Sequence, residues 1–317
     1  MQNILEIKNL SVGFNIDIDN EEKFFYALNN INLSFEKGKI HAIAGESGCG
    51  KSVLISTVLN LLPKNAKITT GEILFKNENL LKIKEKDFQK IRGKRISLIP
   101  QDPFMSLNPL YTIENQLLEV YNDKKIIKEA LEKVKIKNIE TVLKSYPHEL
   151  SGGMKQRVII AMSVISDSDL ILADEPTTAL DVSVSNSILD LLLDFKNLGK
   201  TIVLITHDLS IVANYSDRVN IMYLGDIVES ADSDTLFKEP FHPYTKALLN
   251  ALPNKKGVKL QNIKGQISPI TQPIKGCKFH PRCDFCMEIC KNKKPDTSTK
   301  GTRQVRCHLY NQNQNQN

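Results

Sequence analysis

Residues 45–52 read GESGCGKS and fit the complete pattern G-x-x-x-x-G-K-[ST]. An apolar run typical of a buried strand, residues 39–44, precedes this loop, and an apolar helical pattern over residues 51–62 follows it. Glycines let such a loop turn its N–H groups toward phosphate oxygens, and the N-terminal end of the next helix adds partial positive charge. We therefore expect a nucleotide phosphate to contact Gly45, Glu46, Ser47, Gly48, Cys49, Gly50, Lys51, Ser52 and Val53.

The loop and a second element together predict an ATP site with a metal ion. Lys51 is expected to reach the β- and γ-phosphates of ATP, and the Ser52 hydroxyl to bind Mg²⁺. Residues 169–176, DLILADEP, form an apolar strand that ends in two carboxylates. Asp174 suits the Mg²⁺ shell and Glu175 suits a general base for water, because neighbouring residues at a strand end point in different directions.

Short apolar runs alternate with helical patterns through the first 240 residues. Strands are expected at residues 39–44, 95–99, 170–173 and 201–205, and helices at residues 51–62, 123–135, 154–165 and 184–198. Strands interleaved with helices indicate an α/β fold with a mostly parallel sheet that is covered on both faces. Residues 108–149 contain no strand-like run and are interpreted as an inserted helical lobe.

Residues 150–157, LSGGMKQR, form a second glycine-rich element. Ser151 is suited to cap a helix, while Gly152 and Gly153 leave N–H groups open to an anion. Taken alone, the pattern is more typical of a loop with an N-cap. Together with the motifs above, the sequence resembles the ATP-binding cassette (ABC) family, and this segment resembles its signature motif. The resemblance implies that these three residues grip the γ-phosphate of ATP bound to an opposite subunit.

Other motifs of that family follow in order, and the resemblance implies their roles. Gln101, in LIPQDP, matches the glutamine that senses Mg²⁺ and relays to a membrane partner. Asp181, in the segment 179–181, matches the D-loop at the dimer interface. His207, in LITHDLS, matches the switch histidine that contacts the γ-phosphate.

The same resemblance implies an aromatic side chain that stacks on adenine near the N-terminus. Phe14, at the end of LSVGF, is the best positional match. Residues 15–23 look like an insertion relative to the family, which leaves Phe24 and Tyr26 as alternatives.

The resemblance also implies the domain organisation. The expected fold is a P-loop NTPase core with a parallel sheet, an N-terminal antiparallel β part and a small irregular cysteine-rich C-terminal domain. Residues 1–240 would form the nucleotide-binding domain, with a helical subdomain at about residues 103–165. Residues 241–310 would form the C-terminal extension, and residues 311–317 a disordered, low-complexity tail.

Longer segments narrow the resemblance to the ATPases of oligopeptide and dipeptide importers. They are PQDPFMSLNPLYTI, YPHELSGGMKQR, ADEPTTALDVSV and HPYTKALLNALP, and details such as Ser52-Val53 and Met154 resemble the D-type of the two paralogous subunits. This resemblance implies a heterodimer with a paralogous ATPase, two transmembrane permeases and, indirectly, an extracytoplasmic peptide-binding protein. It places the chain at the cytoplasmic face of the bacterial inner membrane, where ATP hydrolysis powers peptide import. Nickel and glutathione importers share the subfamily and stay open as alternatives.

Composition supports a peripheral subunit with a distinct C-terminal part. No stretch approaches the roughly 20 apolar residues of a membrane helix, and the N-terminus lacks the pattern of a signal peptide. The net charge of +6 combines −4 over residues 1–254 with +10 over residues 255–306. Four of the six cysteines lie in the basic stretch and a fifth, Cys307, follows it directly. In a cytosolic chain, clustered cysteines suggest metal ligands or redox groups before disulfides.

Four of these cysteines, Cys277, Cys283, Cys290 and Cys307, follow the spacing C-x₅-C-x₆-C-x₁₆-C. Four thiolates suffice for either Zn²⁺ or an iron–sulfur cluster, and the spacing does not match common zinc knuckles. The family has cysteines at the same four positions, and the resemblance implies a [4Fe–4S] cluster there. Cys286 departs from the family pattern.

The basic stretch also suggests an alternative, a soluble ABC ATPase that acts on nucleic acid. We do not expect a nucleic-acid partner, because no aromatic-interleaved binding module is evident. The chain carries one phosphate loop and one signature, about 100 residues apart. ABC translation factors carry two cassettes in one chain, and ABC proteins of the repair and chromosome type have long insertions between these motifs. The sequence therefore matches neither class.

Overall fold

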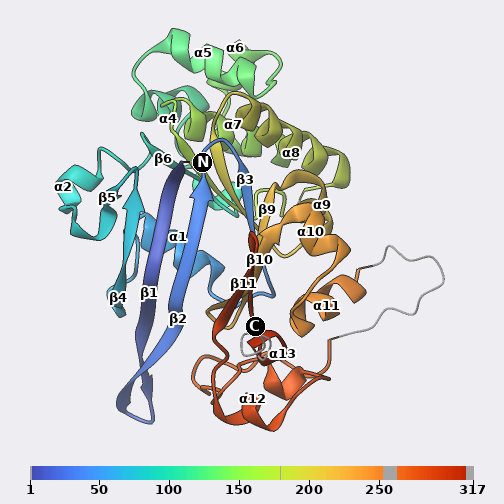
Figure 1. Ribbon diagram of the computed structural model, residues 1–317. Helices are drawn as coiled ribbons and strands as arrows, with labels where there is room; N and C mark the ends of the chain where they lie inside the picture. Colours follow the sequence, from blue (N-terminus) through green and yellow to red (C-terminus); the bar gives the residue numbers. More distant parts are fainter. Residues whose placement is uncertain (1, 179, 253–262, 312–317) are drawn as a thin grey trace. The chain divides into compact units, whose positions relative to one another are not determined.

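The computed structural model describes residues 2–178, 180–252 and 263–311 (Figure 1). The chain divides into two compact units, each assembled from separate stretches of sequence. The first unit consists mainly of Lys82–Ile205, with short segments from the N-terminal region. The second unit consists of Leu5–Phe35, His41–Leu81 and the chain from Thr206 onward.

The first unit contains three parallel, paired strands: β6 (Ile96–Ile99), β7 (Leu170–Asp174) and β8 (Thr201–Thr206). β7 lies between the other two and is buried from Leu170 to Ala173, which explains its continuous apolar sequence. The two long helices of this unit are α7 (Gly152–Val164) and α8 (Val182–Asn197).

Short helices make up the stretch of the first unit between β6 and α7. They are α3 (Pro103–Ser106), α4 (Ile113–Val120), α5 (Lys124–Lys133), α6 (Ile139–Lys144) and the 3₁₀ turn η2 (Pro147–Glu149), preceded in the chain by η1 (Leu80–Lys82) and α2 (Glu85–Phe88). Asp102, Thr112 and Asp123 cap α3, α4 and α5 through side-chain oxygens that accept backbone N–H groups. α5 and α3 pack against α7, and α4 packs against α5, α6 and α7. No strand occurs between residues 100 and 169, all of which the structure describes.

An antiparallel sheet opens the second unit. Its strands are β1 (Asn3–Ile18), β2 (Glu21–Glu36), β4 (Ala66–Phe75) and β5 (Glu78–Asn79), in the order β2-β1-β4-β5 (Figure 1). β1 and β2 are joined at residues 19–20, so the segment that looked like an insertion forms the ends of two paired strands.

Another run of paired strands in this unit includes both the C-terminal strands and the strand that precedes the phosphate loop. Its order is β11 (Thr297–Lys300), β12 (Arg303–Arg306), β10 (Asp226–Asp232), β9 (Arg218–Tyr223) and β3 (Ile40–Ala44). β3 and β9 are parallel, and the other neighbours are antiparallel. The helices are α1 (Lys51–Val58), α9 (Leu209–Tyr215), α10 (Ser233–Lys238), α11 (Pro243–Asn250), η3 (His280–Arg282), α12 (Glu288–Asn292) and α13 (His308–Asn311).

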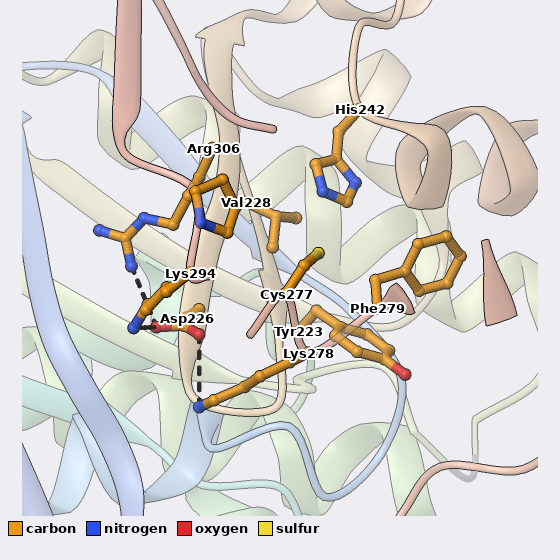
Figure 2. Close-up of a pocket in the computed structure, with 10 residues that line it drawn as sticks. Tyr223, Asp226, Val228, His242, Cys277, Lys278, Phe279, Lys294 and Arg306 are labelled. Atoms are coloured by element: carbon orange, nitrogen blue, oxygen red, sulfur yellow. Dashed lines mark hydrogen bonds and ion pairs between the residues drawn. The ribbon is translucent and has the colours of Figure 1, made fainter. Parts of the chain in front are cut away.

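A buried carboxylate ties the C-terminal segment to β10. Asp226 forms ion pairs with Lys294 at 2.7 Å, Arg306 at 3.0 Å and Lys278 at 3.3 Å. Only 5% of its side chain is exposed. Figure 2 shows the three cationic side chains converging on Asp226 at one side of a pocket with a volume of about 10 Å³, room for about one water molecule. Part of the basic surplus in the C-terminal segment therefore neutralises a buried acid.

The expected strands and helices are confirmed, with shifts at their ends. The first helix is shorter than expected: α1 ends at Val58, and the N–H of Leu61 donates to the carbonyl of Ser56. Asn60 adopts a left-handed backbone with φ of 53°, which stops the helix although apolar residues continue. Strands β9 to β12 were missing from the sequence interpretation. The expected disordered tail falls on residues 312–317, outside the described residues, while Asn311 belongs to α13.

Replacing Asp226 with Asn should destabilise the protein by about 3 kcal/mol, because three partly buried cations would lose the carboxylate that they share. Asp284→Asn is the matched control, since Asp284 pairs with Lys264 at the surface, where such pairs contribute less than about 1 kcal/mol. Thermal and denaturant unfolding of both variants measures the difference. Equal stability of the two variants would contradict a structural role for Asp226.

Candidate functional site

The phosphate loop in the second unit joins β3 to α1. The ammonium group of Lys51 donates to the carbonyls of Gly45 at 2.7 Å and Glu46 at 3.0 Å, and Lys51 is only 6% exposed. Ser47, Gly48 and Ser52 are exposed. The loop thus folds around its own lysine and presents small residues at the surface, as a phosphate cradle requires.

Two glycines of the loop are required by close approaches of other backbone segments. A Cβ atom at Gly45 would lie 2.2 Å from the carbonyl oxygen of Met222 in β9. Gly50 has φ of +110°, and a Cβ atom there would lie 3.0 Å from the carbonyl oxygen of Ala27. Between them, Cys49 is buried, and burial raises the pKa of its thiol, so it is a neutral packing residue at pH 7.

The first unit brings two of the expected catalytic residues into contact. Glu175 follows β7, and its Oε2 accepts hydrogen bonds from the amide of Gln101 and from the hydroxyl of Thr178, both at 3.1 Å. Its backbone has φ of +44°, a left-handed conformation that costs energy for a residue with a side chain. Asp174 is the half-buried last residue of β7. The sequence interpretation missed Thr178, although its position three residues after Glu175 is a usable signal.

The signature segment forms the start of helix α7. The Ser151 hydroxyl accepts the N–H of Met154 at 3.3 Å and caps the helix, as expected. A Cβ atom at Gly153 would lie 2.7 Å from the Val184 side chain, whereas one at Gly152 would make ordinary contacts. Asp181 caps α8 by accepting the N–H of Val184 at 2.9 Å. Ala179, the first residue of the expected D-loop, lies outside the described residues.

His207 and Phe14 lie in the second unit. His207 is exposed and follows β8 directly, and Asp208 caps α9 through a 2.7 Å hydrogen bond from the N–H of Ser210. Phe14 is half-buried on β1, opposite Ala66. Phe24 and Tyr26, on β2, are 36% and 48% exposed and contact each other edge to face. All three aromatics remain candidates for adenine stacking.

Comparison with known proteins decides the family. Residues 28–178 match the family model described as ABC transporter, and residues 228–290 match the model of the oligopeptide/dipeptide transporter C-terminal region. A probable peptide ABC transporter ATP-binding protein of Sinorhizobium fredii is 42% identical over 306 residues, which cover 92% of this chain and 90% of that protein. A dipeptide transport ATP-binding protein of Bacillus subtilis is 40% identical over 329 residues, covering 98% and 96%. The chain belongs to the ABC transporter family.

Solved structures of ABC proteins share the fold. A dimeric ATP-binding cassette, MJ0796, in a post-hydrolysis state with ADP and phosphate, has a TM-score of 0.63 and 29% identity, covering 72% of this chain and 98% of its own. CbiO1 of Clostridium perfringens, part of an ABC transporter complex, has a TM-score of 0.63 and 28% identity, covering 75% and 92%. The expectations of an ABC ATPase fold and of ATP hydrolysis coupled to transport are confirmed. Among the described residues, none of the helices of this ABC chain has the length and apolar character needed to span a bilayer.

The four cysteines expected as ligands of a metal or cluster lie together in the second unit. The pKa of Cys277 is raised to about 12 and that of Cys283 to about 11, mainly by burial and in part by repulsion from neighbouring thiolates. Cys290 and Cys307 are buried, while Cys286 is exposed. However, across residues 2–178, 180–252 and 263–311, no group of three or more His, Cys, Asp or Glu side chains is arranged to hold a metal ion. The donors are gathered, but they do not form a coordination shell.

Proposed function

We propose that the chain is the ATP-hydrolysing subunit of an importer of oligopeptides or dipeptides. The observation that carries this proposal is that both parts of the chain match: the ABC part and the C-terminal part named for oligopeptide/dipeptide transporters. Relatives named as peptide or dipeptide transport proteins are about 40% identical to it over nearly the full length. Nickel and glutathione are the alternative cargoes for an ATP-driven importer of the same kind.

Hydrolysis would use the residues that the sequence motifs single out. The loop of Gly45, Ser47, Gly48 and Gly50 would surround the phosphates, with Lys51 against the β- and γ-phosphates. Ser52, Gln101 and Asp174 would supply a hydroxyl, an amide carbonyl and a carboxylate oxygen, which are oxygen ligands that Mg²⁺ prefers. When bound, this ion would neutralise phosphate charge and fix the triphosphate.

Glu175 would act as the general base. It would accept a proton from the attacking water while the water oxygen bonds to the γ-phosphorus and the bond to the β-phosphate oxygen breaks, which yields ADP and phosphate. The hydrogen bonds from Gln101 and Thr178 hold the carboxylate in one orientation. His207 would contact the γ-phosphate.

Assembly with a second ATPase subunit would complete each site. Ser151, Gly152 and Gly153 would present N–H groups to the γ-phosphate bound by the partner, and Asp181 would lie at the dimer interface. We propose a heterodimer with a paralogous ATPase, associated with two transmembrane permeases at the cytoplasmic face of the bacterial inner membrane. An extracytoplasmic peptide-binding protein would deliver the cargo, and no nucleic acid takes part.

We also propose that Cys277, Cys283, Cys290 and Cys307 bind a [4Fe–4S] cluster, with Zn²⁺ as the alternative. Four cysteines lie close together, and a bound cluster or Zn²⁺ would displace their protons and pair with the resulting thiolates, while the basic residues of the same segment would offset the remaining negative charge. Binding would require the four thiols to rearrange into a tetrahedral set.

Glu175→Gln should bind ATP but hydrolyse it at least about a hundredfold more slowly, because the amide cannot accept the proton of water. Glu140→Gln is the control, since Glu140 is an exposed carboxylate that pairs with Lys128 at the surface. Phosphate release at saturating Mg²⁺–ATP measures the rate of hydrolysis. Gel filtration in the presence of ATP measures dimerisation. Near-normal turnover by Glu175→Gln would remove Glu175 from the role of base.

The importer proposal is tested by purification of the tagged chain from membranes in detergent, with identification of all bound chains. We expect a second ATPase and two permeases. Uptake of labelled di- and oligopeptides by cells should be lost with Glu175→Gln, while uptake of nickel and glutathione should not change. Loss of nickel or glutathione uptake instead would assign a different cargo, and capture of nucleic acid without permeases would refute the importer.

The cluster proposal predicts that protein purified without oxygen is brown and contains about four irons and four sulfides per chain. Cys290→Ser should lose the iron, whereas Cys286→Ser should retain it, because Cys286 is exposed and outside the proposed ligand set. A colourless protein with one zinc per chain would assign Zn²⁺. A protein free of both metals would show that the thiols are not ligands.

A further inference from the structure

The second residue of the phosphate loop, Glu46, is held by a side chain that lies far along the chain. Arg282, in η3, donates from Nη1 to Oε2 of Glu46 at 2.8 Å and from Nη2 to Oε1 at 3.1 Å. This is a two-pronged pairing of guanidinium and carboxylate, which fixes both distance and orientation. The Arg282 side chain is 5% exposed and that of Glu46 is 26% exposed, so the pair is largely shielded from water.

Tyr244, the last residue of the His-Pro-Tyr segment at the start of α11, holds the backbone of the same residue. Its hydroxyl accepts the N–H of Glu46 at 3.1 Å, and the ring is fully buried. His242 fixes Tyr244 in turn, because its Nδ1 accepts the N–H of Tyr244 at 3.0 Å. Burial lowers the pKa of His242 to about 3, so the imidazole stays neutral and remains an acceptor at physiological pH.

Arg282 is itself fixed by contacts with Lys264 and Tyr223. Its Nε donates to the carbonyl of Lys264 at 2.8 Å, and its guanidinium lies 5.8 Å from the centre of the Tyr223 ring. Tyr223, Tyr244 and Phe279 pack against one another with ring centres 4.6 to 5.3 Å apart. The aromatic cluster and Arg282 in the C-terminal part of the second unit thus hold Glu46 of the loop.

The contacts of Glu46 with Arg282 and Tyr244 affect both the position of Lys51 and the charge of the loop. Its carbonyl and that of Gly45 receive the ammonium group of Lys51, the side chain expected to reach the phosphates. Its carboxylate is a negative charge within a loop that binds a triphosphate, so an unpaired Glu46 would oppose nucleotide binding. Arg282 neutralises that charge, and Tyr244 fixes the peptide whose carbonyl meets Lys51.

We propose that Arg282 and Tyr244 are positioning residues for ATP: through Glu46 they hold the phosphate loop in its binding shape, so that nucleotide affinity depends on the C-terminal region. Neither residue touches the nucleotide or takes part in hydrolysis. Both lie within the C-terminal region that distinguishes this chain from a bare ABC cassette, since the family match over residues 228–290 includes them.

The test measures the dissociation constant of trinitrophenyl-ATP with Mg²⁺, and KM and kcat for ATP, on the full-length chain. Arg282→Gln should weaken nucleotide binding by about tenfold, because it leaves the Glu46 carboxylate unpaired in the loop. Tyr244→Phe, which removes only one oxygen, should weaken binding by about fivefold. In both variants KM for ATP should rise with the dissociation constant, while kcat at saturating ATP stays within about twofold.

Two controls and a rescue separate positioning from general damage. Tyr310→Phe removes a hydroxyl that donates to the carbonyl of Phe241 and contacts neither Glu46 nor Arg282. Lys291→Gln removes an exposed cation from the same region. Both variants should bind nucleotide as the parent does within about twofold. The double variant Glu46→Gln with Arg282→Gln should bind more tightly than Arg282→Gln alone, since the unpaired charge is then gone.

A merely structural role would lower the fraction of active protein and leave KM and the dissociation constant of the remainder unchanged. That result, or unchanged affinity in Arg282→Gln and Tyr244→Phe, would overturn the proposal. If Arg282→Gln is insoluble, Tyr244→Phe decides alone, because a buried phenylalanine keeps the shape of the cluster. These outcomes are independent of cargo, since they concern nucleotide affinity only.

Discussion

The phosphate loop depends on the close approach of two backbone segments. β9 brings the carbonyl oxygen of Met222 so near to Gly45 that a Cβ atom would lie 2.2 Å away, so only glycine fits. This contact sets where the loop leaves β3, and Gly50, with its positive φ, sets where α1 begins. Lys51 then turns back onto the carbonyls of the loop. A glycine pattern in the sequence is therefore a requirement of packing as well as of phosphate binding.

Glu175, the proposed general base, shows a similar balance between strain and support. Glu175 carries a left-handed backbone, which a residue with a side chain adopts only when its surroundings compensate. Its N–H donates to the carbonyl of Ile205 in the neighbouring strand β8, and Gln101 and Thr178 donate to its side chain. The strand end therefore determines the position of the backbone, and the two donors determine the orientation of the carboxylate.

The parts of the site that could be predicted from sequence are those whose residues lie close together in the chain. The loop at residues 45–52, Ser151 as a helix cap and the carboxylates after β7 all follow from local spacing, because a strand end or a helix start imposes the geometry. The pairing of Arg282 with Glu46 joins residues 236 positions apart, and no local pattern predicts it. Strands β11 and β12 were missed for a related reason: the polar sequence TSTK pairs because β12 lies against β10, an effect of tertiary structure.

One short element connects the phosphate loop to the cysteines. Arg282 ends η3 and Cys283 follows it directly, while the N–H of His280, at the start of η3, donates to the carbonyl of Cys277. Any rearrangement that brings Cys277 and Cys283 into a ligand set acts on the same three residues that place Arg282 against Glu46. Cysteine variants that lose a cluster would therefore be expected to change nucleotide affinity as well. Variants of Arg282 and Tyr244 that leave the thiols intact separate the two effects, because they alter the loop contact without removing a ligand.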